Sequence, residues 1–172
     1  MPAKFLLVPA ALIAASPAMA AEDLTFEEAQ QRLVPGATLT PLFFKLNDRM
    51  SDLITDSAQV TVWFRDVKVW FVSGGGLLFL DQVPGRDDWI TYAVALDDKG
   101  AVKGIEILEC LPKYDQITLP AWRAQYTGKQ FATLDKKDVT AISGTTLSSF
   151  HITNGVKRIL AIYTLIMARP KP

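Results

Sequence analysis

A cluster of hydroxyl side chains lies in the segment DVTAISGTTLSSFHITNGVKRIL, directly before an apolar pattern of helical spacing. Five hydroxyls fall close together: Ser143, Thr145, Thr146, Ser148 and Ser149. One Ser or Thr is enough to cap a helix, and Gly144 supplies the bend before it. The free N–H groups and the dipole at a helix N-terminus favour negative charge. The surplus of hydroxyls therefore predicts a ligand that carries a phosphate group.

Other candidate residues lack the partners that their chemistry requires. Gly74–Gly76 is followed neither by Gly-Lys-Ser/Thr nor by a helix pattern, so it predicts a flexible turn. His151 is the sole histidine and Cys110 the sole cysteine, which excludes a disulfide within the chain and a metal site of the usual His and Cys type. Carboxylates alone could hold calcium, but no EF-hand spacing is present. We expect no metal site.

The sequence does not predict an enzyme with its own substrate pocket. Ser148, His151 and Asp138 supply the residue types of a hydrolase triad, but no G-x-S-x-G elbow is present. A serine and a histidine three residues apart are simply neighbours on one helix. The tryptophans could stack on a ring ligand, although a place in the core is the better expectation for any one of them. Cys110 is expected to be a packed apolar side chain rather than a redox centre.

The elements that must position the hydroxyl cluster are helices and strands in mixed order. Thr25 and Glu28 have capping-box spacing, which predicts a short helix that ends before Pro35. A second helix is expected over residues 47–55. Segments rich in β-branched and aromatic residues predict strands: VTVWFRDVKVWFV, GLLFLDQV, WITYAVALD and VKGIEILEC. The last two form a predicted hairpin, Trp89–Asp97 with Val102–Cys110, whose second strand is expected to be covered on both faces near its end.

The remaining helices follow the hairpin. A short helix is expected after Pro120, ending at Gly128. A long final helix begins around Leu147, and its apolar stripe should face the sheet. The members of this stripe are Val156, Ile159, Leu160, Tyr163 and Ile166 or Met167.

The first residues and the charge balance bound the location and the partners. MPAKFLLVPAALIAASPAMAAED has a lysine, a short apolar run and an Ala-x-Ala end, so residues 1–20 are predicted to be a signal peptide cleaved after Ala20. The apolar run is too short for a comfortable membrane anchor. The mature domain would then be residues 21–172, exported to the periplasm. With 18 basic and 18 acidic residues, no basic stripe points to nucleic acid, which we do not expect as a partner.

Several segments together resemble one known family. AISGTTLSS followed by an amphipathic helix resembles the Ser/Thr-Gly-Ala-Thr signature of the FMN-binding domain family. That family includes flavin-carrying subunits of sodium-pumping NADH:quinone reductases and small exported flavoproteins. TFEEAQQRLVPGA is similar to its N-terminal helix, WITYAVALDDKGAVKGIEILEC to its central hairpin, and WRAQYTGK to its W-x-x-Q-F/Y-x-G-K segment.

The resemblance implies a site and a cofactor. In the family the last threonine of the signature carries FMN through a phosphoester bond, and a flavin transferase attaches it from FAD. The matching position is Thr146. The residues expected to form the phosphate loop around it are Ser143, Gly144, Thr145, Leu147 and Ser148. Trp122 or Tyr126 is expected to border the flavin ring.

Three positions depart from the family pattern. The residue before the acceptor is Thr145 rather than alanine, and the acidic residue three before the signature serine is replaced by Thr140. After the hairpin, LECLPKYDQ carries Pro112 and Lys113 where relatives often have a Glu. If that loop lies over the flavin, the cation of Lys113 would favour the reduced anionic ring and raise its potential.

The resulting prediction is an α+β single domain, with a mainly antiparallel twisted sheet flanked by helices. It would carry covalent FMN and transfer electrons between redox partner proteins in an extracytoplasmic or membrane-linked chain. The alternative is an exported binding or interaction module on the same fold that has lost the flavin.

Overall fold

The computed structural model describes residues 23–168, and the predicted signal peptide, residues 1–20, lies outside them. Within this range one five-stranded antiparallel sheet has the strand order β1-β2-β3-β4-β5. The strands are β1 Leu39–Lys45, β2 Asp66–Val72, β3 Leu77–Pro84, β4 Trp89–Leu96 and β5 Val102–Glu109. The α-helices are α1 Phe26–Leu33, α2 Asp48–Ala58, α3 Pro120–Arg123 and α4 Thr146–Met167. Two 3-10 helices, η1 Pro112–Thr118 and η2 Ala124–Tyr126, flank α3.

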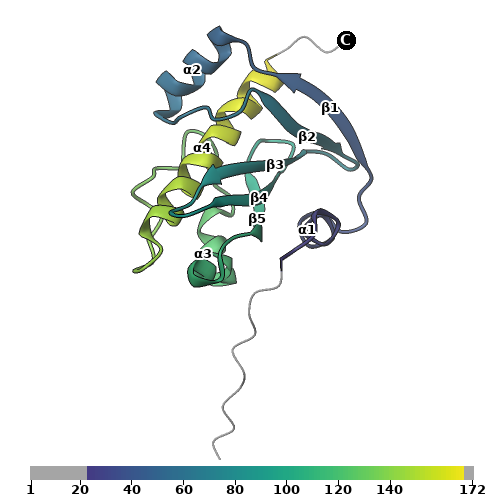
Figure 1. The fold of residues 1–172 in the computed structure, drawn as a ribbon. Helices are drawn as coiled ribbons and strands as arrows, with labels where there is room; N and C mark the ends of the chain where they lie inside the picture. Colours follow the sequence, from purple (N-terminus) through teal and green to yellow (C-terminus); the bar gives the residue numbers. More distant parts are fainter. Residues whose placement is uncertain (1–22, 169–172) are drawn as a thin grey trace, which may run out of the picture.

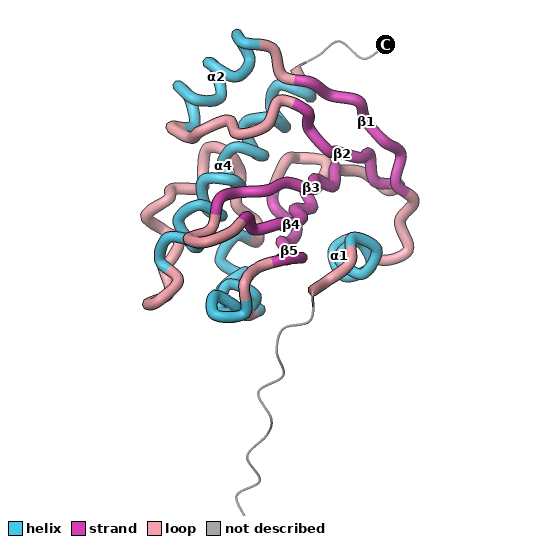
Figure 2. The backbone as a smooth tube through the Cα atoms, in the orientation of Figure 1, coloured by secondary structure: helices cyan, strands magenta, loops and turns pink. Residues whose placement is uncertain are grey.

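The sheet lies between two helical layers (Figure 1). On one face, α4 packs over β3 and β4 with α2 beside it, and Phe79 and Ile159 belong to the large core between them. On the other face, α1 packs against β4 and β5, where Ala29 and Leu78 belong to a second, smaller core. The connection from β5 to α4 consists of short helices and loops (Figure 2). The structure is a single α+β domain, which confirms the predicted fold class.

Two features of the sheet differ from the sequence prediction. Strand β1 was not expected, because Pro41 stands in its middle and proline interrupts a strand pattern. Since β1 pairs only with β2, it is an edge strand and tolerates the missing N–H. Residues 60–65, expected to begin a strand, are wrongly predicted. The chain there lies outside the sheet, between α2 and β2, and the carbonyl of Thr61 accepts a hydrogen bond from Arg158 Nη1 at 3.0 Å.

The other predicted elements are confirmed with small shifts. Thr25 and Glu28 form both hydrogen bonds of a capping box at the start of α1. The hairpin of β4 and β5 pairs as expected, and β5 is buried on both faces from Ile105 to Leu108. The helix α2 runs three residues beyond the expected range, to Ala58. The stripe of α4 faces the sheet through its buried residues, with Ile166 rather than Met167 at its end.

Helix α4 lies close to the sheet at Gly155. A Cβ atom at this position would lie 2.1 Å from the hydroxyl oxygen of Tyr92 and 2.8 Å from Val83 Cγ1. Real Cβ atoms do not approach other heavy atoms this closely, so the position requires glycine. The absence of a side chain at Gly155 therefore allows α4 to pack closely against β3 and β4.

A buried polar network fixes α4 further along. Arg158, 3% exposed, forms an ion pair with Asp81 of β3, and the Tyr92 hydroxyl donates to Asp81 Oδ2 at 2.9 Å. Arg158 also donates to the carbonyls of Thr61 and Gln82. A buried charge is tolerated when it is paired and hydrogen-bonded in this way. The network sets the rotation of α4 about its own axis, and so the direction in which its first turn points.

None of the helices between residues 23 and 168 is long and apolar enough to cross a membrane.

Candidate functional site

The loop before α4 turns sharply around the carbonyl of Ile142. That oxygen accepts hydrogen bonds from the backbone N–H of Thr145 at 3.0 Å and from Thr146 Oγ1 at 3.2 Å. Gly144 has a φ of +88°, in the left-handed region that favours glycine. The Ser-Gly-Thr-Thr sequence thus forms a tight turn that delivers Thr146 as the first residue of the helix.

The first turn of α4 has backbone donors without helical acceptors. Thr145 is the N-cap residue, and within the described chain its side chain makes no capping hydrogen bond. The Thr145 carbonyl accepts from the N–H of Ser149 at 2.9 Å. The preceding N–H groups, of Thr146, Leu147 and Ser148, therefore lie before the first helical hydrogen bond and have no acceptor within the helix.

Two serine hydroxyls add to these unused donors. Ser148 and Ser149 are each 1% exposed, and among the described residues neither Oγ atom has a hydrogen-bond partner. A buried hydroxyl without a partner is unfavourable by about 1–3 kcal/mol. Such a group is rare in a stable fold unless a ligand, ion or water satisfies it.

A cavity of about 290 Å³ opens at this helix start. It is lined by Arg86, Tyr114, Gly144, Thr145, Thr146, Leu147 and Ser148. Five of these residues belong to the loop and first turn of α4, and the other two come from the β3–β4 loop and from η1. The lining thus brings together one arginine, the residues that carry the free N–H groups, and Ser148 with its buried hydroxyl.

The two threonines of the turn differ in exposure. Thr145 is 2% exposed, and its Oγ1 lies 3.5 Å from the Ile142 carbonyl. Thr146 is exposed and lines the cavity. Only Thr146 therefore presents its hydroxyl group to a large partner without a change in the loop.

Most of the residues predicted for the phosphate loop are brought together. Gly144, Thr145, Leu147 and Ser148 line the cavity with Thr146. Ser143 is exposed on the same turn, but it does not belong to the lining.

Trp122 and Tyr126 lie in the core rather than along this cavity. Trp122 Nε1 donates to the Thr140 carbonyl at 2.9 Å, which anchors the segment leading to the loop. The Tyr126 hydroxyl forms a 2.8 Å hydrogen bond with Thr153 of α4, and burial raises the pKa of Tyr126. In this structure the two residues contact the segment before the loop and helix α4 from within the core. Contact of either residue with a flavin ring stays a prediction.

The two wall residues Arg86 and Tyr114 were missed in the sequence. Tyr114 is buried, and its hydroxyl donates to Asp87 Oδ2 at 2.6 Å. Lys113 Nζ lies 2.5 Å from the same oxygen. Hydrogen bonds from Lys113 and Tyr114 hold the pKa of Asp87 below its ordinary value. A short loop containing Arg, Asp and Asp resembles any solvated turn, so its sequence gave no signal.

Lys113 was expected to place a free cation near the ring. Its pairing with Asp87 makes the two groups nearly neutral when seen from a distance, which weakens the expected field at a flavin. The predicted rise in potential stays a prediction, and the pairing makes the expected rise smaller.

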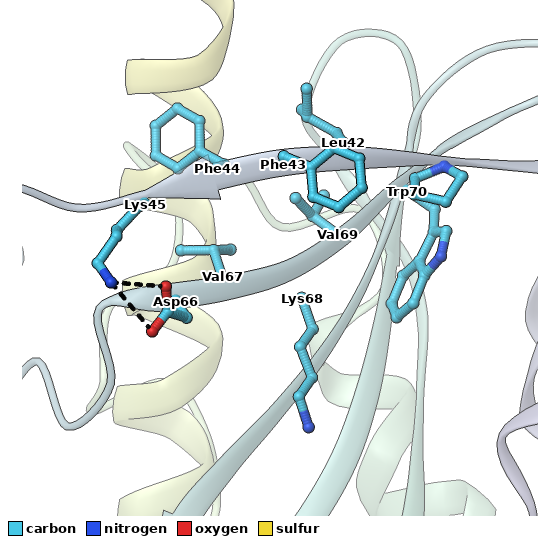
Figure 3. A pocket seen from close by; sticks show the side chains of 10 residues that line it. Leu42, Phe43, Phe44, Lys45, Asp66, Val67, Lys68, Val69 and Trp70 are labelled. Atoms are coloured by element: carbon cyan, nitrogen blue, oxygen red, sulfur yellow. Dashed lines mark hydrogen bonds and ion pairs between the residues drawn. The ribbon is translucent and has the colours of Figure 1, made fainter.

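A larger cavity lies elsewhere, over the ribbon of β1 and β2 (Figure 3). It measures about 370 Å³, and its lining includes the exposed Phe43 and Lys68 and the partly buried Trp70. At one end Lys45 pairs with Asp66 at 3.1 Å. The described lining residues include no hydroxyl cluster or helix N-terminus, so this groove lacks the donors of the α4 site.

Comparison with known proteins agrees with the chemistry of the α4 site. No curated protein matches the chain. Residues 85–161 match the family model of the FMN-binding domain. The match begins in the loop that carries Arg86, contains the hairpin of β4 and β5, and ends within α4. It supports FMN as the cofactor and a flavin-binding role. The match over residues 85–161 supports the assignment of this part of the chain to the FMN-binding domain family.

Proposed function

We propose that the protein carries FMN covalently, as a phosphoester on Thr146, and transfers electrons between redox partners outside the cytoplasm. The observation that carries the proposal is the position of the Thr146 hydroxyl. Thr146 is the exposed first residue of α4 and lines a cavity whose lining also includes Ser148, with its unpartnered hydroxyl.

The residues of the cavity fit a phosphate group. The N–H groups of Thr146, Leu147 and Ser148 and the Ser148 hydroxyl supply hydrogen-bond donors, and the helix dipole adds partial positive charge. Leu147 is a half-exposed apolar side chain beside them and offers a surface for the ribityl chain or the ring. When bound, FMN supplies one- and two-electron redox chemistry. The protein holds the phosphate, limits the motion of the attached group and shields part of it from water.

Attachment requires one substitution at phosphorus. Thr146 Oγ1 forms the new O–P bond to the FMN half of FAD, the phosphoanhydride bond of FAD breaks, and AMP leaves with its phosphate. The hydroxyl proton is taken up by a base of the transferase or by water. The turn around Ile142 holds Thr146 Oγ1 3.2 Å from a carbonyl, so the hydroxyl oxygen is oriented before the transferase arrives.

The departures at Thr140 and Thr145 do not disturb the loop itself. The backbone N–H of Thr140 donates to Gln125 Oε1 at 2.8 Å, and its side chain is exposed. Thr145 fits in a buried position where the family usually has alanine. The non-redox module on the same fold remains the alternative outcome of the test below.

The test is co-expression with a flavin transferase and export, followed by intact mass measurement. We expect a mass increase of one FMN less one water, a yellow protein, and fluorescence that persists after denaturation. The attached flavin should be reduced and reoxidised reversibly. If the wild type acquires no flavin under conditions that load a typical family member, the non-redox module becomes the better account.

A further inference from the structure

Arg86 is the cationic residue among those lining the α4 cavity. It lies in the short loop between β3 and β4, far in sequence from the hydroxyl cluster. Across residues 23–168 its guanidinium group makes no hydrogen bond or ion pair, whereas neighbouring charged groups are engaged. No carboxylate belongs to the described lining, and the nearby Asp87, which interacts electrostatically with Arg86, is already paired with Lys113.

The loop that carries Arg86 is fastened on several sides. Within it, the Gly85 N–H donates to the Asp88 carbonyl at 2.7 Å. From η1, Lys113 and Tyr114 both hold Asp87. From α4, His151 Nδ1 donates to the carbonyl of Pro84. Arg86 therefore projects from a backbone tied to both of the other elements that line the cavity.

Close approach also restricts the loop at Gly85. A Cβ atom there would lie 2.6 Å from the Asp88 carbonyl oxygen and 3.2 Å from Ile90 Cγ1. The position therefore has no room for a side chain, and the backbone just before Arg86 lies close to Asp88 and Ile90.

A second observation in the cavity points to an anion independently of the helix start. Ser148 is 1% exposed and belongs to the cavity lining, and its buried hydroxyl has no hydrogen-bond partner in the described chain. A buried neutral donor without a partner and a guanidinium group without a hydrogen bond, on residues that line the same cavity, form a set that phosphate oxygens can complete.

We propose that Arg86 binds the phosphate of the flavin nucleotide as its charge partner, while Ser148 and the N–H groups of α4 provide the neutral hydrogen bonds. The inference rests on the proposed function and assigns a specificity residue to the same site. Arg86 makes the site select phosphorylated flavin over riboflavin, which has the same ring and no charge. It also holds the phosphodiester in place after attachment.

The experiment separates the phosphate from the ring. The Thr146→Ala variant, which cannot form the ester, is titrated with FMN and with riboflavin, and the titrations are repeated with Arg86→Gln added. We expect Arg86→Gln to weaken FMN binding by about tenfold or more and to leave riboflavin binding unchanged. Arg86→Lys should restore part of the loss, since it keeps the charge without the planar fork. Arg49→Gln removes an exposed arginine of α2 and is the matched control, with no effect expected.

Two outcomes overturn the inference. One is equal weakening of FMN and riboflavin by Arg86→Gln, and the other is no weakening of either. If the Thr146→Ala variant binds too weakly to titrate, the transferase-loaded proteins decide instead. The ³¹P NMR shift of the attached phosphodiester should then differ between wild type and Arg86→Gln, and an unchanged shift contradicts the proposal.

Failure of the proposed function gives a different result. In that case the wild type neither loads nor binds any flavin. Titration of the unloaded protein with inorganic phosphate then tests Arg86 alone. Phosphate binding that Arg86→Gln removes and Arg49→Gln keeps would preserve the anion site without a flavin. If no variant binds phosphate, both the proposed function and the proposed anion site at Arg86 are contradicted.

Discussion

The adjacent threonines of the Ser-Gly-Thr-Thr turn carry the same hydroxyl group, but the fold gives them different surroundings. Successive residues of a helix point about 100° apart, so only one of two neighbours can face a given partner. Both threonines belong to the cavity lining, but Thr145 is only 2% exposed, whereas Thr146 is exposed. From the sequence, only the family resemblance favoured Thr146 over Thr145 as the acceptor. In the structure the two residues differ in burial.

Thr146→Ala is expected to abolish the flavin mass shift, and Thr145→Ala to preserve it. The reason is that Thr146 Oγ1 is the exposed hydroxyl at the helix start. Intact mass of each variant, co-expressed with a flavin transferase, measures the result. Loss of flavin in Thr145→Ala alone would move the acceptor by one residue and leave the function standing.

Cys110 provides a prediction that concerns reactivity and pH. Burial raises the pKa of its thiol to about 11, so the reactive thiolate is scarce at neutral pH. Alkylation by iodoacetamide, followed by mass spectrometry, should be slow at pH 8 and should accelerate as the pH rises toward that value. Cys110→Ala should leave flavin loading and colour unchanged. Loss of bound flavin in that variant would show that the thiol takes part in the site.

At the scale of elements, the seating of α4 depends on the missing side chain at Gly155. Alanine would improve helix propensity by about 1 kcal/mol. Its Cβ would collide with the Tyr92 hydroxyl and Val83, and overpacking of a core typically costs about 1–3 kcal/mol. The cost of the collision exceeds the gain in helix propensity, because the buried Tyr92 ring and Val83 have little room to move away from the added methyl group.

Gly155→Ala is therefore expected to lower the free energy of unfolding by about 1–2 kcal/mol, measured by urea denaturation of the unloaded protein. Thr164→Ala, at an exposed position of the same helix, is the control and should change it by less than about 0.5 kcal/mol. A Gly155→Ala variant as stable as the wild type would mean that α4 shifts on the sheet without loss of packing.

How much of this architecture the sequence predicts depends on whether the signal is local. Helix α4, the hairpin and the hydroxyl turn were predicted, since periodicity, turn residues and capping chemistry act over a few neighbours. Strand β1 was missed because its pairing with β2, rather than its own pattern, makes it a strand despite Pro41. Arg86 was missed for the same reason. Its relation to Ser148 exists only after the sheet and α4 have packed.

At the scale of the whole molecule, the N-terminal segment connects to the fold almost at once. The N–H of Leu24 donates to the carbonyl of Leu108 at 2.8 Å, so the chain is attached to β5 within a few residues of the predicted cleavage point. Cleavage after Ala20 would therefore leave only a short extension before the folded domain.

The mature protein is expected to begin at or near Ala21 and to be found in the periplasm. N-terminal sequencing of the protein purified from the periplasmic fraction measures the start directly. A variant with the Ala18 and Ala20 positions changed to large residues should remain uncleaved, because signal cleavage requires small residues there. Recovery of wild-type protein with an intact Met1 in the membrane fraction would contradict the prediction.

The uncapped start of α4 has a consequence for the life of the protein before loading. A hydrogen bond from the N-cap side chain stabilises a helix by about 0.5–2 kcal/mol. The N-cap residue of α4, the longest helix of the described chain, makes no such bond. On the proposed function, the cofactor itself completes the cap, so loading and folding stability become linked quantities. Unloaded copies would open at this end more often and would be degraded sooner than loaded ones. Proteases would in this way remove copies that have not received the cofactor, and no separate quality-control protein would be needed.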